Sequence, residues 1–305
     1  MRRTLTRGWI LTFVLSGGFL ILYLPNLVNW KYSRMSPHVP EEVQHIEREI
    51  RGSSLDGIHV VMVFPLIVSD VWNGLGYNDS SLELRKRRQQ EYVDCLRANL
   101  NIRTVARIHL FSNQPDLLRI KVVTKYKLNA TKIHIHKSNL NPTYRDIFKY
   151  VSDFLQNKLV FILNADNFMG ESFNSVSLDW WGKSGKMMYA LTRHRLKPRP
   201  ADCQISADGY CDPEGSYLGS HDGFMFYMKG TFPEDFLSEL SFSSHAYGSE
   251  NVVIWAFERK LNFSVKNPCR RLAVYHNHCT DVRATMEYRT RVNVGGKSGV
   301  APFSD

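Results

Sequence analysis

Residues 159–167 read Leu-Val-Phe-Ile-Leu-Asn-Ala-Asp-Asn. Five apolar residues without a polar break, followed by turn-forming residues, predict a buried central strand of an α/β sheet. Ligands of open α/β sheets bind beyond the carboxyl ends of the strands. Asp166 therefore stands where a carboxylate can hold a divalent metal ion and, through it, the phosphates of a nucleotide. The alternative is an Asx-turn that only closes the strand, and this stretch alone does not separate the two.

Strands and helices alternate on both sides of this strand. Apolar and β-branched runs predict the strands, and apolar residues at helical spacing predict the helices. Strand, helix, strand is the pattern of a parallel sheet with right-handed crossovers. The predicted strands cover residues 58–65, 105–112, 120–126, 132–136, 159–163, 187–194, 224–228, 264–268 and 272–278, and the predicted helices cover residues 81–99, 141–157, 232–236 and 252–259.

The composition is that of a globular protein. The chain has 305 residues, which allows one large domain or two small ones, and its 43% hydrophobic residues exclude a disordered chain. A net charge of +10 indicates anionic partners such as nucleotide phosphates or phospholipid. The chain shows no zinc-finger or RNP pattern, so we expect no nucleic-acid partner. We interpret the dense cluster Arg85-Lys86-Arg87-Arg88 as a solvated helix face.

The N-terminal segment predicts a membrane anchor. Residues 9–28 carry no charge and are mostly apolar, and at ~1.5 Å per residue a helix of this length spans a bilayer of ~30 Å. Basic residues precede it, which favours a cytoplasmic tail over residues 1–8. A signal peptide cleaved after Ser16-Gly17-Gly18 is the alternative. We expect a stem over residues 29–57, a catalytic domain over residues 58–290 and a flexible tail over residues 291–305.

The N-glycosylation sequons agree with a body in the secretory lumen. Sequons for N-glycosylation at Asn78, Asn129 and Asn262 all follow the predicted anchor. Together with the anchor they predict a single-pass type II protein of the Golgi or endoplasmic reticulum membrane.

The five cysteines suit an oxidising compartment. Cys203 and Cys211 flank a short polar loop, and Cys269 and Cys279 lie ten apart near the end, so both pairs are candidate disulfides. Cys95 remains, and we expect a buried thiol on a helix. No Cys-x-x-Cys spacing supports zinc binding.

Five short motifs in a fixed order carry a family resemblance. They are Asn164-Ala165-Asp166, Ala190-Leu191-Thr192-Arg193, Gly219-Ser220-His221-Asp222, Gly248-Ser249-Glu250-Asn251 and Tyr275-His276-Asn277-His278. In this order they resemble a poorly characterised group of GT-A type nucleotide-sugar glycosyltransferases. The resemblance covers residues 58–282 and implies a Rossmann-like, mixed and mostly parallel sheet flanked by helices.

The resemblance also implies a metal site. GT-A enzymes hold Mn²⁺ or Mg²⁺ on the donor diphosphate with an Asp-x-Asp turn, and Asp166 matches the second carboxylate of that turn. Asn164 replaces the first carboxylate, so one negative charge is missing, although an amide oxygen still ligates a hard cation or bonds the ribose. His276 and His278, near the end of the domain, are the candidates to complete the metal shell. Arg193 is placed to offset the diphosphate charge.

For catalysis, an inverting enzyme needs a general base beside the acceptor hydroxyl. Glu250 matches the acidic residue of the family's acceptor-side motif, and its alternative role is an interaction with the helix dipole. Asp222 is the second candidate, as base or as a clamp on sugar hydroxyls.

These features predict a glycosyltransferase that moves a sugar from a nucleotide-sugar donor to a glycan, protein or lipid acceptor in the secretory pathway. The alternative is a catalytically inactive GT-A fold that serves as a luminal binding or scaffold protein, as the missing carboxylate at Asn164 suggests. A nucleotidyltransferase typically carries a Gly-rich basic loop after its first strand. Pro65-Leu66-Ile67-Val68 occupies that position here and argues against this third class.

Overall fold

The computed structural model describes residues 10–15, 18–23, 55–67, 81–196, 203, 211, 220–282, 291–292 and 295–304. The chain divides into two units, residues 1–49 and residues 50–305, and each is described by itself. Most of the predicted stem, and parts of the loop after residue 196 and of the C-terminal tail, lie outside the described residues.

The first unit contains two strands where the sequence predicts a helix. β1 (Ile10–Leu15) pairs antiparallel with β2 (Gly18–Tyr23). The length and hydrophobicity of this run predict a helix. Its Ile, Val, Phe and Tyr residues suit strands equally well, which explains the difference from the prediction. Among the described residues, no helix combines the length and the apolar character needed to cross a membrane. The membrane anchor over residues 9–28 stays a prediction.

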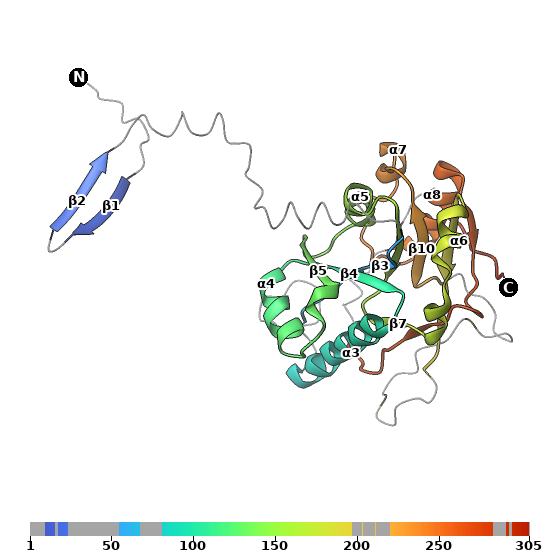
Figure 1. Ribbon diagram of the computed structural model, residues 1–305, viewed down its shortest axis with the longest axis horizontal. Coiled ribbons are helices and arrows are strands. Elements are labelled where there is room, and N and C mark those ends of the chain that lie inside the picture. The colour runs from blue at the N-terminus through green and yellow to red at the C-terminus, as the bar shows by residue number, and fades with distance from the viewer. Residues whose placement is uncertain are drawn as a thin grey trace, which may run out of the picture. The chain divides into compact units, whose positions relative to one another are not determined.

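The second unit is built on a mixed, mostly parallel sheet (Figure 1). Among the described residues, seven strands form this sheet in the order β11-β8-β10-β6-β3-β4-β5. Of these strands only β10 runs opposite to the others. The strands are β3 (Ile58–Val63), β4 (Val105–Ser112), β5 (Ile133–Lys137), β6 (Lys158–Leu163), β8 (Met187–Leu191), β10 (Gly223–Met228) and β11 (Ser264–Lys266).

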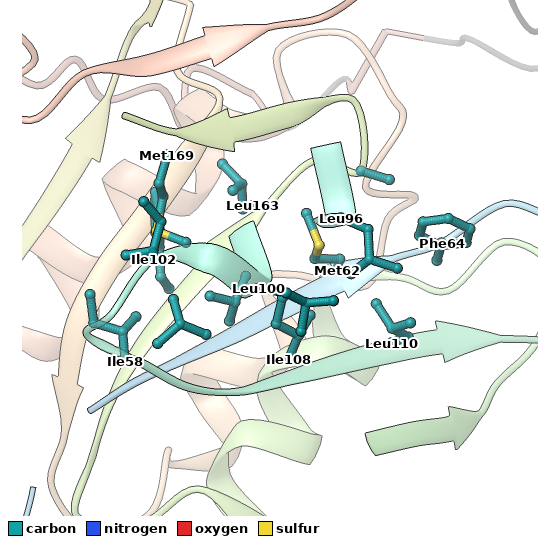
Figure 2. Close-up of a cluster of buried hydrophobic side chains, with 14 of the residues drawn as sticks. Ile58, Met62, Phe64, Leu96, Leu100, Ile102, Ile108, Leu110, Leu163 and Met169 are labelled. Carbon is teal, nitrogen blue, oxygen red and sulfur yellow. The ribbon is translucent and has the colours of Figure 1, made fainter. Parts of the chain in front are cut away.

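One face of the sheet packs on α3 (Leu82–Asn101). Figure 2 shows Met62 of β3 beside Leu96 and Leu100 of α3, and Ile58 of β3 near Ile102, which follows α3; all are almost fully buried. The side chain of Ser81 caps the helix by accepting a hydrogen bond from the Leu84 amide, as its polar character at that position predicts. This packing fixes α3 against the strands and so positions the charged side chains along it.

The other face packs on α5 (Tyr144–Phe154), which starts with a capping box between Thr143 and Asp146. Phe148 of α5 is fully buried and lies at the centre of an aromatic cluster. The rings around it, at 5.5–6.0 Å between centroids, belong to Phe226, Phe232, Phe236 and Phe257. They come from β10, from α7 (Glu234–Ser238) and its preceding residues, and from α8 (Ser249–Leu261).

A second, small sheet lies beside the end of β6. β12 (Val274–His276) pairs antiparallel with β7 (Asn167–Met169) and parallel with β9 (Arg193–His194). Short helical segments complete the unit: α4 (Pro115–Leu118), α6 (Leu178–Lys183) and 3₁₀ turns at Ala130–Lys132 and Glu171–Ser175.

One predicted strand is wrong. Residues 120–124 belong to the π-helical turn Arg119–Thr124, which continues α4, and residues 125–126 lie in the turn after it. Pro115 and Asp116 start this helical segment, and Leu118 and Val122, four residues apart, are both buried. The β-branched residues of this segment predict a strand. The segment is helical because its apolar residues are spaced so that a helix buries them on one face.

The predicted disulfide pairing is also wrong. The bridges join Cys203 to Cys279 and Cys211 to Cys269, so they link the two cysteine pairs instead of closing each one. The small sheet explains the pairing, because β9 and β12 lie side by side and bring the residues that follow β9 next to those that flank β12. Cys95 is a buried free thiol on α3, as predicted. The sequon residues Asn129 and Asn262 are exposed, and Asn78 lies outside the described residues.

Candidate functional site

The site forms where three neighbouring strands reach one edge of the main sheet. Leu163, the last residue of β6, and Leu191, the last residue of β8, both pair with Gly223 at the start of the reversed strand β10. The turn with Asp166 and the segments with Arg193 and Asp222 therefore meet at this edge, which is the carboxyl edge of the parallel strands.

Asp166 is held at the end of β6 by the small sheet. Its backbone carbonyl accepts a hydrogen bond of 2.8 Å from the Asn277 amide, which locks the turn to the end of β12. Its carboxylate lies 3.1 Å from Nε2 of His276. Asn167, next to it, pairs in register with His276. The Asn164 side chain is exposed.

Asp166, His276 and His278 come together as a possible ligand set. Their ligand atoms all lie within 4.8 Å of one another. The two imidazole rings are 5.4 Å apart between centroids, and Nδ1 of His276 is buried without a hydrogen-bond partner among the described residues. A carboxylate with two imidazoles fits a transition-metal ion such as Mn²⁺ better than Mg²⁺, which prefers oxygen ligands. The residues present therefore fit the expected metal, and their role as ligands stays a prediction.

Arg88 lies inside this site, contrary to its interpretation as part of a solvated helix face. Its guanidinium donates to the Asp166 carboxylate at 2.5 Å and to Glu91 at 2.6 Å, and its side chain is 3% exposed. It also donates to the Asn277 carbonyl at 3.1 Å and stacks over the Tyr92 ring at 4.4 Å. Arg88 precedes Tyr92 by four residues and Cys95 by seven, so helical spacing places it on the buried face of α3. That spacing is the signal in the sequence that would have found it.

Glu91 fastens α3 to the segment after His278. One of its carboxylate oxygens binds Arg88, and the other accepts hydrogen bonds from the Cys279 amide and from the amide and hydroxyl of Thr280. The Cys203–Cys279 disulfide is attached at the same place. The two histidines are thus carried by a segment that is fixed at both ends.

The charges around Asp166 set its ionisation. Burial alone would raise the pKa of the Asp166 carboxyl, but the charges of His276 and Arg88 outweigh it and hold that pKa well below its usual range. Burial would likewise lower the pKa of Arg88, whereas Tyr92, Asp166 and Glu91 raise it above its ordinary value. Both groups are therefore charged at neutral pH.

Arg193 and Asp222 form a second pair at the same edge. The Arg193 guanidinium donates to the Asp222 carboxylate at 2.7 Å, and the other carboxylate oxygen accepts from the Arg193 amide at 3.3 Å. The Asp222 carbonyl lies 3.5 Å from the amide nitrogen of the Asn167 side chain, which ties this pair to the Asp166 turn. The structure pairs Arg193 with Asp222.

Glu250 stands at the start of α8, after Gly248, whose φ of +74° is a left-handed conformation that suits glycine. Burial raises the pKa of Glu250, and the charge of Asp222 raises it further. Tyr144, the first residue of α5, lies in the same neighbourhood: burial and the charge of Glu250 raise its pKa. Tyr144 is therefore an additional candidate site residue, which the sequence marks only as a position of the predicted helix over residues 141–157.

A second group of possible ligands does not make a metal site. His194, Cys211 and Cys269 lie within ligand distance of one another, but both cysteines are consumed by their disulfide. His194 instead bonds the Cys269 carbonyl at 2.7 Å.

Comparisons with known proteins give distant similarities. No protein-family model and no curated protein matches the chain. A putative glucose-1-phosphate thymidylyltransferase from Bacillus anthracis, solved in complex with a sucrose, is 8% identical with a TM-score of 0.39 over 80% of this chain and 98% of that chain. HddC from Yersinia pseudotuberculosis is 12% identical with a TM-score of 0.32 over 61% of this chain and 80% of that chain. Mannose-6-phosphate isomerase from Helicobacter pylori is 10% identical with a TM-score of 0.31 over 48% of this chain and 53% of that chain, so the match spans about half of the isomerase.

Proposed function

We propose that this chain is a glycosyltransferase of GT-A type that transfers a sugar from a nucleotide-sugar donor to a glycan, protein or lipid acceptor. The observation that carries the proposal is one sheet edge with a possible metal-ligand set and, near Asp222 at that edge, the half-buried carboxyl of Glu250 with a raised pKa. The first group suits a donor diphosphate, and the second suits the removal of a proton from an acceptor hydroxyl.

The donor half of the site comprises Asp166, His276 and His278. These side chains would hold a metal ion such as Mn²⁺, which would supply positive charge to offset the negative charge that builds on the departing nucleoside diphosphate. Arg193 lies at the same edge and adds positive charge toward the phosphates. Arg88 keeps the Asp166 carboxylate ionised and oriented.

The acceptor half comprises Glu250, with Asp222 and Tyr144 around it. In the transfer, the bond between the anomeric carbon and the donor phosphate oxygen breaks, and a bond from the acceptor oxygen to that carbon forms. The proton of the acceptor hydroxyl passes to the Glu250 carboxylate, and the nucleoside diphosphate leaves. A carboxyl with a raised pKa is a stronger base than an ordinary one, which suits Glu250 to this role.

The test uses the purified full chain with Mn²⁺ and a panel of nucleotide sugars, and it measures transfer or slow donor hydrolysis. Glu250→Gln should lower kcat about 100-fold or more with little change in the donor KM, because it removes the base and not the donor contacts. Glu258→Gln is the matched control, since Glu258 lies on the same helix and burial also raises its pKa. The proposal fails if no nucleotide sugar is bound or consumed.

A luminal binding or scaffold protein on the same fold is the second candidate. The observation that favours it is the Arg88–Asp166 ion pair, because a guanidinium already supplies a positive charge where the metal ion is expected. Asn164 removes a carboxylate from the same turn. This candidate predicts a folded protein that binds saccharide but shows no Mn²⁺-dependent turnover with any donor.

We also propose that the protein is anchored in the Golgi or endoplasmic reticulum membrane with its catalytic domain in the lumen. The uncharged run at residues 9–28, the exposed sequon residues Asn129 and Asn262, and the two disulfides support this location. Glycosidase-sensitive glycans at Asn129 and Asn262 would support it, and a protein without glycans that is released by carbonate washing would contradict it.

A further inference from the structure

A cavity of about 620 Å³ lies behind the small sheet. Phe168 and Tyr275 line it, and they are the chain neighbours of Asn167 and His276. Successive side chains of a strand point to opposite faces, so the cavity opens on the face away from His276. It is therefore separate from the candidate active site, although it shares the strands β7 and β12 with it.

An aromatic pair forms one wall of the cavity. Phe168 and Tyr275 face each other across β7 and β12, and their rings stack with centroids 5.3 Å apart and planes 26° apart. Both rings are half-buried, so part of each remains open to the cavity. Such a surface is flat and apolar and carries one hydroxyl, which matches the apolar face and hydroxyl rim of a sugar ring.

Two arginines form another wall. Arg270 and Arg271 both line the cavity and are exposed, and among the described residues neither has a carboxylate partner in an ion pair. The one acidic residue among the described lining residues is Glu171, so the lining carries an excess of positive charge. Arginine binds carboxylate, sulfate and phosphate groups through paired N–H donors.

The walls are fixed before any ligand arrives. The Cys211–Cys269 disulfide holds the turn with the two arginines, because Cys269 directly precedes Arg270 and is fully buried. Asn99 of α3 holds β7 by donating to the Asn167 carbonyl at 3.0 Å and accepting from the Met169 amide at 2.9 Å. Because these walls are already held in place, the protein loses little conformational entropy when a ligand binds in the cavity.

We propose that this cavity is a second saccharide site that binds an acidic sugar, a ring carrying a carboxylate, sulfate or phosphate group. The ring packs on Phe168 and Tyr275, and the anionic group pairs with Arg270 and Arg271. Asn101 and Glu171 also line the cavity and supply polar groups for ring hydroxyls. Binding here needs no nucleotide sugar and no metal ion, so its outcome is independent of the transfer assay.

The test is calorimetric titration of the purified full chain, without metal, with three oligosaccharides of equal length: one with glucuronic acid, one with a sulfated sugar and one neutral. At least one acidic oligosaccharide should bind ten times or more tightly than the neutral one. The double variant Arg270→Gln/Arg271→Gln should weaken that binding about tenfold or more, and because both side chains are exposed it should still fold.

The control is Arg259→Gln/Lys266→Gln, which removes the same two charges from exposed positions outside the cavity lining. Its affinity should match that of the unmodified protein. Equal affinity for acidic and neutral oligosaccharides, no binding of any of them, or equal losses in both double variants would overturn the proposal. The acidic oligosaccharide that binds more tightly, with glucuronic acid or with a sulfated sugar, identifies the anionic group.

Discussion

Asp166 has two partners that together explain why the Asn-Ala-Asp turn is more than the end of a strand. His276 reaches its carboxylate from β12 and Arg88 reaches it from α3. A turn that only closed β6 would not require a buried cation. The ion pair also links the proposed donor half of the site to α3, the longest described helix.

The first prediction concerns Arg88. Arg88→Gln should lower the free energy of unfolding by about 3 kcal/mol or more, because it leaves the buried carboxylates of Asp166 and Glu91 without their cation. Arg87→Gln, at the exposed neighbouring position, should change it by less than about 0.5 kcal/mol. Urea unfolding of the full chain measures both. Equal effects of the two substitutions would show that Arg88 is not held in a buried ion pair.

At this scale, part of the site could be predicted from the sequence. Asp166, Asp222 and Glu250 each stand at a strand end or a helix start, and local pattern places them there. The sequence pattern misplaces Arg88 because it sits in a run of basic residues, and its partner Asp166, in the turn after β6, is 78 residues away in the chain. A run of charged residues predicts an exposed helix face. Whether one of these charges is buried depends on which element packs against that part of the helix.

Among the secondary-structure elements, features set by a segment's own sequence are predicted correctly, and features set by contacts between distant segments are not. The strands β3, β4, β5, β6 and β10 match the predicted ranges closely, because each has a continuous or alternating pattern of its own. The disulfide pairing was mispredicted because it depends on the neighbours of β9 and β12 in space and not on the distance between cysteines in the chain.

The second prediction concerns these disulfides. Peptide mapping without reduction should recover Cys203 joined to Cys279 and Cys211 joined to Cys269. Each bridge spans a long segment, 76 and 58 residues, so reduction of either should lower the free energy of unfolding by about 4 kcal/mol through loop-closure entropy. A recovered Cys203–Cys211 peptide would contradict the structure.

The third prediction concerns a histidine cluster on the α5 face of the sheet. His59 and His109 share a hydrogen bond of 3.0 Å, and His109 also bonds the Tyr150 hydroxyl at 2.9 Å. His134 and His136, on the edge strand β5, pack their rings on Tyr150 and are half-buried.

Burial lowers the pKa of His109, His134 and His136, and Arg107 lowers that of the first two further. The folded protein therefore keeps these rings neutral at pH values where the unfolded chain protonates them. Their contribution to stability is fully present above about pH 6.5 and is lost as the pH falls below it. Asp56, which bonds His59 and Lys158, has a lowered pKa and stays ionised in this range.

The free energy of unfolding should accordingly fall between pH 7.5 and pH 5.5, with a slope of up to about 1.4 kcal/mol per pH unit for each histidine that stays neutral. His134→Gln should reduce the slope, because it removes one such group from the sheet edge. Urea unfolding at several pH values measures it. A stability that is independent of pH over this range would show that the cluster takes up protons in the folded state.

For the whole molecule, sequence patterns predicted the α/β class and the mostly parallel sheet because hydrophobic periodicity is repeated in every element. They did not predict that the apolar run at residues 9–28 contains two strands in the structure, since its composition suits either form. The small sheet was also missed, because its strands are two or three residues long and show no period. Yet this sheet brings together most of the candidate site.

The fourth prediction is that Asp166 binds a metal ion that holds the donor diphosphate. Equilibrium binding of a nucleotide-sugar panel to the full chain, with Mn²⁺ and with a chelator, tests it most directly. Asp179→Asn, an exposed aspartate on α6, is the control. The unmodified protein and the control should bind a donor about tenfold or more tightly with Mn²⁺. Asp166→Asn should lose that dependence, and an unchanged Mn²⁺-dependent affinity in Asp166→Asn would contradict the claim.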